Sequence, residues 1–183
     1  MTSFREVGPK ALTCVWDTSA LLHAARASRL DVLGDFVKGT SEHPWNHYIP
    51  ATVAEELAQL GAAPPDWASV VHVDGLSEIV AFGEWSQRLV AGPHHRGEAA
   101  VAAWAQSHAA TAVIDDNDAR LVAQQHGLDA HGSIWVLCQA ISCAVICVYT
   151  ATSYCDAVIS HGARMPFEVG GFEAWVRRQG LIR

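Results

Sequence analysis

The sequence is poor in charge, and above all in positive charge. Charged residues make up 17% of the 183 residues, Lys10 and Lys38 are the only lysines, and the formal net charge is -7. A negative excess repels a phosphate backbone at long range, so the composition excludes a protein that gathers nucleic acid through a broad basic surface. Any contact with nucleic acid is therefore expected to be local.

Cysteine spacing also excludes several classes of site. The five cysteines contain no CxxC pair, and four of them fall in one apolar stretch, so we predict small buried hydrophobic residues in a reducing compartment. The first ten residues lack the apolar core of a signal peptide, which predicts a cytoplasmic protein. No Pro-, Gly- or Ser-rich tract divides the chain. We expect a single domain over residues 1–183, with a core at 12–150 and a helical extension at 151–183.

One apolar run approaches the length of a membrane span. It covers residues 134–151 and reads IWVLCQAISCAVICVYTA. Gln139 and Ser142 interrupt it, and it lacks the flanking Lys or Arg that is typical of spanning helices. We therefore predict a buried helix that begins at Gly132-Ser133, and no membrane association.

Short apolar runs alternate with segments of helical spacing along the chain. This alternation predicts an α/β fold with a central parallel sheet of about five strands and helices on both faces. The predicted strands are residues 12–16, 47–49, 70–73, 111–114 and 128–131. The predicted helices are residues 20–37, 51–60, 76–90, 98–110 and 119–126, the apolar helix from 133, a helix from 153 and a terminal amphipathic segment after 171.

Acidic residues gather at the boundaries of these predicted elements. The carboxyl ends of parallel strands meet at one edge of a sheet, so acids that follow the first and fourth strands should share a rim. Hard cations such as Mg²⁺ and Mn²⁺ prefer carboxylate oxygens, and a cation relieves the repulsion between close carboxylates. The acids at these boundaries are Asp17, Glu55, Glu56, Glu98, Asp115, Asp116 and Asp118.

Five segments carry a resemblance to a known family. They are VWDTSALL (15–22), IPATVAEEL (49–57), GEAAVAAWA (97–105), VIDDNDARLVAQQHGL (113–128) and HGSIWVL (131–137). In this order and at this spacing the chain resembles PIN domains, and within them the branch related to toxin–antitoxin ribonucleases. The resemblance implies a three-layer α/β/α fold around the parallel sheet.

The resemblance also implies a set of site residues. Glu55 is the alternative register for Glu56, and either Asp115 or Asp116 would face the metal. Asp118 would either assist the site or cap the helix that starts at Ala119. The expected catalytic residues are Asp17, Glu56, Glu98 and Asp116, which together with Asp115 are the expected ligands of Mg²⁺ or Mn²⁺.

Three further residues are expected to contact the substrate. Thr18 and Ser19 follow Asp17 and can also cap the helix that they begin. Arg120 lies one turn beyond the acidic cluster, where it could hold a phosphate, orient a carboxylate or make a structural ion pair.

The activity that the resemblance implies is metal-dependent phosphodiester hydrolysis, usually of RNA, in which a bound ion activates water. As a toxin the protein would be silenced by an antitoxin whose basic residue enters the acidic pocket, and a homodimer is compatible with this role. The alternative is an inactive PIN-like module that binds a protein or RNA, which the low basic content and Trp16 favour. A phosphoacceptor receiver domain fits less well, because neither Lys10 nor Lys38 follows a late strand.

Histidines and tryptophans are abundant, at ten and seven residues. His94-His95 lies in a Gly/Pro loop without the helical spacing of zinc ligands, so we predict no zinc site there. Three tryptophans occupy core-like positions, whereas three others suit a partner surface or stacking on bases. The first group is Trp16, Trp104 and Trp135, and the second is Trp45, Trp67 and Trp85.

Overall fold

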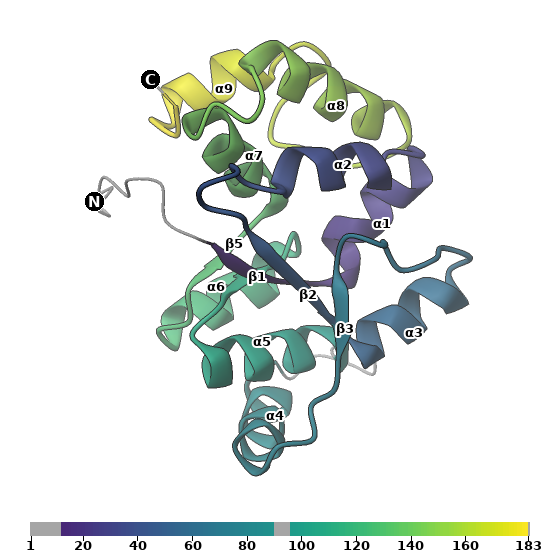
Figure 1. Ribbon diagram of the computed structural model, residues 1–183, viewed down its shortest axis with the longest axis vertical. Coiled ribbons are helices and arrows are strands. Elements are labelled where there is room, and N and C mark those ends of the chain that lie inside the picture. Colours follow the sequence, from purple (N-terminus) through teal and green to yellow (C-terminus); the bar gives the residue numbers. More distant parts are fainter. Residues whose placement is uncertain (1–11, 90–95, 183) are drawn as a thin grey trace.

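The computed structural model describes residues 12–89 and 96–182 of the chain, so His94-His95 lies outside the described residues. Its centre is a sheet of five parallel strands in the order β3-β2-β1-β4-β5 (Figure 1). The predicted parallel α/β architecture is therefore confirmed. The strands are β1 (Thr13–Trp16), β2 (Asn46–Pro50), β3 (Ser69–Val71), β4 (Thr111–Val113) and β5 (Ala130–His131).

Helices surround the sheet on both sides (Figure 1). Helices α4, α5 and α6 lie on one side, and α2 and α7 lie on the other, with α8 and α9 packed outside them. The helices in the described ranges are α1 (Thr18–Arg26), α2 (Leu30–Val37), α3 (Ala51–Gln59), α4 (Leu76–Arg88), α5 (Arg96–His108), α6 (Asn117–Gln125), α7 (Ser133–Ser142), α8 (Val148–Ser160) and α9 (Phe172–Arg178).

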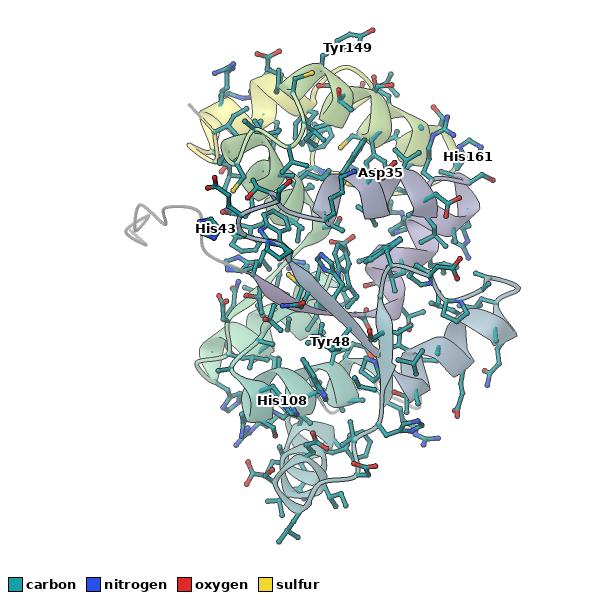
Figure 2. The ribbon with its side chains drawn as sticks, viewed as in Figure 1. Asp35, His43, Tyr48, His108, Tyr149 and His161 are labelled. Atoms are coloured by element: carbon teal, nitrogen blue, oxygen red, sulfur yellow. The ribbon has the colours of Figure 1, made fainter. Side chains whose placement is uncertain are left out.

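Both faces of the sheet are covered, which explains why its strands are apolar throughout. On one face Tyr48 packs against Trp104 of α5, which stacks on His108 with 4.3 Å between ring centroids (Figure 2). On the other face Trp16 Nε1 donates to His47 Nδ1 at 2.9 Å. His47 Nε2 therefore carries the ring proton and donates to the carbonyl of Val37 at 2.6 Å.

The continuous helix predicted for residues 20–37 is wrong, because two helices occupy this segment. Helix α1 ends before Ser28, whose φ is 54°. The Ser28 and Arg29 amides donate to the carbonyls of Ala25 and Ala24, which closes the helix end. Helix α2 then starts in a new direction while keeping its apolar side, including Leu33, in the core.

The long apolar helix predicted from residue 133 is also shorter than expected. Helix α7 ends at Ser142, Ala144 has a φ of 56°, and α8 begins at Val148 rather than at residue 153. Among the described residues, no helix has both the length and the apolar character needed to cross a membrane.

The tryptophans correct one prediction. Trp85 is 1% exposed and Trp45 is 7% exposed, while Trp67 is half-buried and its Nε1 donates to the carbonyl of Leu30. The buried rings of Trp45 and Trp85 are not available for a partner or for bases, so the surface role predicted for these two is wrong. For the half-buried Trp67 that role stays a prediction. Trp16 and Trp104 are buried as predicted, whereas Trp135 is half-buried and stacks on His131.

Candidate active site

Asp17 stands where β1 passes into α1, at the carboxyl edge of the sheet. Its amide donates to the carbonyl of Val113 on β4 at 2.9 Å, and its Oδ2 accepts hydrogen bonds from Ser19 N at 3.0 Å and Ser19 Oγ at 2.6 Å. The side chain is 2% exposed, and this burial raises the pKa of Asp17 to about 6 although the Ser19 hydrogen bonds oppose the rise. Asp17 is thus both the cap of α1 and a desolvated carboxylate.

Glu56 projects from α3 toward the starts of α1 and α5. The hydroxyl of Thr18 donates to Glu56 Oε2. A Cβ at Gly97 would lie only 2.7 Å from the same oxygen, so the absence of a side chain at Gly97 lets the carboxylate approach α5. Glu55 is exposed instead. Of the two registers, the structure therefore brings Glu56 to the rim.

Glu98 lies in the first turn of α5 and is the centre of the acidic cluster. Burial, together with the negative charges of Asp17, Glu56 and Asp116, raises the pKa of Glu98 to about 7. Carboxylates from β1, α3, α5 and the end of β4 therefore act on one another across a shared region. The structure brings together the four residues predicted to be catalytic.

The three acids after β4 have different surroundings. Asp116 is the cap of α6, because its Oδ1 accepts a hydrogen bond from Ala119 N at 2.9 Å. Asp118 is exposed in the first turn of the same helix. Asp115 turns toward α7, where its two oxygens accept hydrogen bonds from Ser133 N at 2.7 Å and Ser133 Oγ at 2.8 Å.

Arg120 directs its guanidinium back to the loop that precedes its own helix. Nη1 donates to the carbonyls of Ile114 at 2.8 Å and Asp115 at 3.0 Å, and Nη2 donates to Asn117 Oδ1 at 3.0 Å. These contacts hold the loop in place. The role of Arg120 in substrate binding stays a prediction.

A divalent cation fits the site by its donor chemistry. The cluster offers hard carboxylate oxygens, and a cation would relieve the repulsion that, after burial, raises the pKa of Glu98. Within residues 12–89 and 96–182, no group of three or more His, Cys, Asp or Glu side chains is positioned to hold a metal ion as it stands. Local hydrogen bonds hold three of the carboxylates, from Ser19 to Asp17, from Thr18 to Glu56 and from Ala119 to Asp116.

Sequence reasoning missed two polar residues beside these acids. Ser133 donates hydrogen bonds to both oxygens of Asp115, and no pattern in the local sequence predicts this contact. Thr52 lies one helical turn before Glu56, and its buried hydroxyl has no hydrogen-bond partner among the described residues. The only sequence signal for Thr52 is its spacing: it lies four residues before the predicted ligand Glu56, on the same side of a helix.

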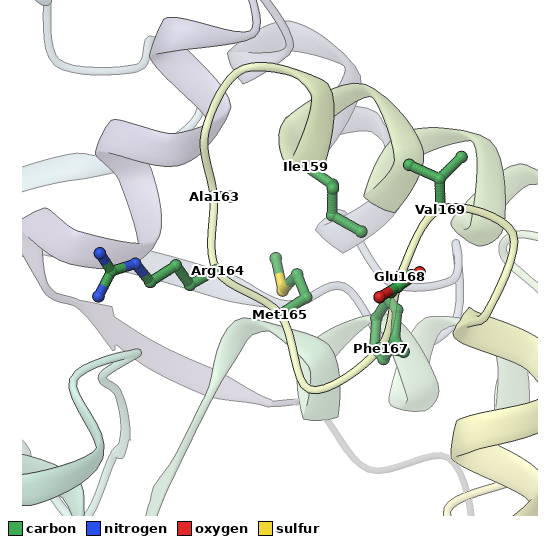
Figure 3. A pocket seen from close by; sticks show the side chains of 7 residues that line it. All are labelled: Ile159, Ala163, Arg164, Met165, Phe167, Glu168 and Val169. Carbon is green, nitrogen blue, oxygen red and sulfur yellow. The ribbon is translucent and has the colours of Figure 1, made fainter.

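Two open pockets lie among the described residues, and neither is lined by the site acids. An open pocket of about 450 Å³ lies beside α8 and the segment that leads to α9, and none of the site acids lines it (Figure 3). Its charged lining residues are Arg164 and Glu168. The candidate site is defined here by the chemistry of its side chains.

The fold and the site together define a class: a parallel α/β protein with a carboxylate cluster at the carboxyl edge of its sheet. The family model DUF3368, described as a PIN domain, matches residues 13–170. The chain therefore belongs to the PIN-domain family, whose members are in general metal-dependent nucleases. Comparison with curated proteins gives no match.

Proposed function

We propose that this protein is a ribonuclease that depends on Mg²⁺ or Mn²⁺ and serves as the toxin of a toxin–antitoxin pair. The observation that supports it most directly is the convergence of Asp17, Glu56, Glu98 and Asp116 from four separate elements. Carboxylates that lie this close repel one another unless a cation or a proton neutralises part of their charge. In a family of metal-dependent nucleases, the cluster is therefore suited to binding the metal ion.

The roles of the residues follow from their contacts. Asp17, Glu56, Glu98 and Asp116 would hold the ion, which supplies an activated water and charge stabilisation at the phosphate when bound. Ser19 orients Asp17 and Thr18 orients Glu56 through the hydrogen bonds of their hydroxyls. Without the ion the pKa of Glu98 is about 7, so a cation that binds near neutral pH would displace a proton from this carboxyl group.

The remaining parts of the proposal concern partners and setting. RNA is the proposed substrate, and an antitoxin with a basic side chain would neutralise the acidic rim. We further propose a single domain over residues 1–183, with a core at 12–150 and an extension at 151–183, that acts in the cytoplasm. A homodimer is compatible with this role.

The test is cleavage of labelled single-stranded RNA and DNA by purified protein freed of partners, with Mg²⁺, Mn²⁺ or EDTA. We expect RNA cleavage that EDTA abolishes, and a loss of at least about 100-fold in Asp17→Asn and Glu56→Gln. Glu55→Gln is the matched control, because its side chain is exposed on the same helix, and it should retain activity within about threefold.

Two other outcomes have definite meanings. Intact RNA and DNA under every condition would refute the nuclease and favour a PIN-like module that binds a partner or RNA without cutting. Cleavage that persists in EDTA or in Asp17→Asn would indicate a contaminating enzyme or a different site.

A further inference from the structure

We propose that Asp115 and Arg120 are positioning residues, which brace the loop between β4 and α6 so that Asp116 faces the acidic cluster. The proposal rests on the proposed function for what Asp116 does, and on the hydrogen bonds of the loop for the brace itself. In this proposal Asp115 binds α7 and is not a metal ligand, and Arg120 binds the loop and does not contact the substrate.

Arg120 holds the loop from within. Its Nη1 donates to three successive carbonyls, those of Ile114 at 2.8 Å, Asp115 at 3.0 Å and Asp116 at 3.5 Å. Its Nη2 donates to Asn117 Oδ1 at 3.0 Å. A planar guanidinium can serve several acceptors at fixed angles, which a lysine ammonium on a flexible stem cannot match. Its donors are thus directed to the backbone that carries the two aspartates.

Asp115 links the same loop to two neighbouring helices. Its carboxylate accepts two hydrogen bonds from Ser133 in the first turn of α7, where the helix dipole favours a negative group. Its own amide donates to Ser19 Oγ at 3.2 Å, and this hydroxyl donates to Asp17. The loop is therefore tied to α7 on one side and to the start of α1 on the other.

Gly132 shows how closely the parts of the brace fit. A Cβ at Gly132 would lie 3.0 Å from Asp115 Oδ1 and 3.6 Å from Arg120 Nη1. The first distance is tighter than an ordinary contact and the second is not, so the space for the Asp115 carboxylate depends on the absence of a side chain where β5 passes into α7.

The brace separates the two neighbouring aspartates. Asp115 faces away from the cluster, where its charge adds to burial in raising the pKa of Tyr154 and Cys155 on α8. Asp116 acts on Glu98, and its Oδ2 has no hydrogen-bond partner among the described residues. One carboxylate is thus committed to structure, while the other keeps an oxygen for a ligand.

The first experiment measures amide hydrogen exchange by NMR in metal-free protein. The probe is the Ala119 amide, which donates to Asp116 Oδ1, and the reference is the Val15 amide in the core. Arg120→Lys and Ser133→Ala should each speed exchange of the Ala119 amide about 3–10-fold, as expected for the loss of one or two hydrogen bonds, with Val15 unchanged. Arg177→Lys is the matched control, an arginine that pairs with Glu173 on α9.

The second experiment measures Mn²⁺ binding by calorimetry and the KM for RNA cleavage. Asp116→Asn should abolish carboxylate-dependent Mn²⁺ binding, whereas Asp115→Asn should keep the affinity within about tenfold, the range of a residue that acts through a ligand. Arg120→Lys should weaken Mn²⁺ binding about tenfold while the KM for RNA stays within about twofold.

The outcomes separate the brace from the proposed function. Unchanged Ala119 exchange in both Arg120→Lys and Ser133→Ala refutes the brace, whether or not the protein binds metal. Loss of Mn²⁺ binding in Asp115→Asn equal to that in Asp116→Asn makes Asp115 a ligand and overturns its assignment. A raised KM with unchanged Mn²⁺ affinity in Arg120→Lys makes Arg120 a substrate contact. A wild-type protein that binds no Mn²⁺ refutes the proposed function, and the exchange data still decide the brace.

Discussion

Burial gives Asp17 a free-energy cost in the folded protein, in addition to its role as the cap of α1. Its side chain is almost completely buried, and the pKa of about 6 shows that its ionised form is disfavoured inside the protein. Ser19 compensates this cost only in part. A residue that weakens the fold near neutral pH and belongs to an acidic cluster is typical of a site that gives up stability for binding.

Asp17→Asn should therefore stabilise the metal-free protein at pH 7. Between the ordinary pKa of 3.8 and about 6 the folded state binds more protons than the unfolded state, so the unfolding free energy falls as pH rises through this window. The variant should gain about 1–3 kcal/mol at pH 7 and almost nothing at pH 4, measured by urea unfolding in EDTA. Asp118→Asn, at an exposed position, should change stability by less than about 0.5 kcal/mol. A destabilised Asp17→Asn would contradict this account.

His47 acts in the opposite direction on stability. Burial lowers the pKa of His47 from 6.5 to about 4, although the hydrogen bond to the Val37 carbonyl opposes the shift. The neutral ring accepts a hydrogen bond from Trp16. Below pH 6.5 the unfolded chain takes up a proton that the folded chain resists, so stability is lost as pH falls from about 6.5 to about 4.

His47→Gln should remove this acid sensitivity, because a glutamine amide does not titrate and can replace one acceptor and one donor. The wild-type protein should lose up to about 3 kcal/mol relative to the variant between pH 7 and pH 4, measured as the difference between their urea unfolding curves. Taking the difference cancels the contribution of Asp17. His161→Gln, at an exposed position, should reproduce the wild-type pH dependence.

Helix ends explain why several elements are shorter than their apolar patterns. Ser28, Ala109 and Ala144 have φ values of 54°, 50° and 56°, a left-handed conformation that is costly for residues with a Cβ. At Ala144 the amides of residues 144 and 145 donate to the carbonyls of residues 141 and 140, as in a Schellman motif. Helix α7 packs against α2, whereas α8 packs against α1 and α9, and this packing stabilises the break against the local preference.

Ala144→Gly should stabilise the protein by up to about 1 kcal/mol, because glycine adopts the left-handed region without the Cβ penalty. Thermal and urea unfolding both report the change. Ala157→Gly in the middle of α8 is the control and should lower stability by about 0.5–1 kcal/mol. Equal destabilisation by both glycines would mean that the turn at residue 144 is not formed.

At the scale of the whole molecule, the charge distribution argues for local recognition of a nucleic acid. The net charge is -7, and the donors of Arg120 point to its own loop. Arg96 is exposed two residues before Glu98 and is the basic side chain nearest in sequence to this acid. Binding should depend on the metal site and a small number of phosphate contacts.

RNA binding at constant Mn²⁺ should therefore depend weakly on salt. For about two phosphate contacts the plot of log affinity against log salt has a slope of about -1.4 for a single strand. Arg96→Gln should reduce the slope by about 0.7, whereas Arg88→Gln, whose guanidinium binds Glu84 on the surface, should leave it unchanged. A slope steeper than about -4 would require a basic surface that the composition does not supply.

Much of this protein was determined by local sequence. Apolar runs predicted the parallel sheet, and the acids that follow strands predicted a common rim, because neighbouring parallel strands end at the same edge. The spaced motifs predicted the PIN family, which the family match confirms. Each of these features depends on a short segment of the chain, so it can be recognised from the sequence alone.

Only the tertiary structure decided between neighbouring residues of the same type. Glu55 and Glu56 share one helix, but Thr18 and Gly97 meet Glu56 alone. Asp115 and Asp116 share one loop, but only Asp115 accepts hydrogen bonds from Ser133, which lies 18 residues further along the chain. Asp116 stays at the rim. The positions of the tryptophans and of the helix breaks at Ser28 and Ala144 have the same origin. Each depends on a contact between distant segments, and such contacts leave no periodic signal in the sequence.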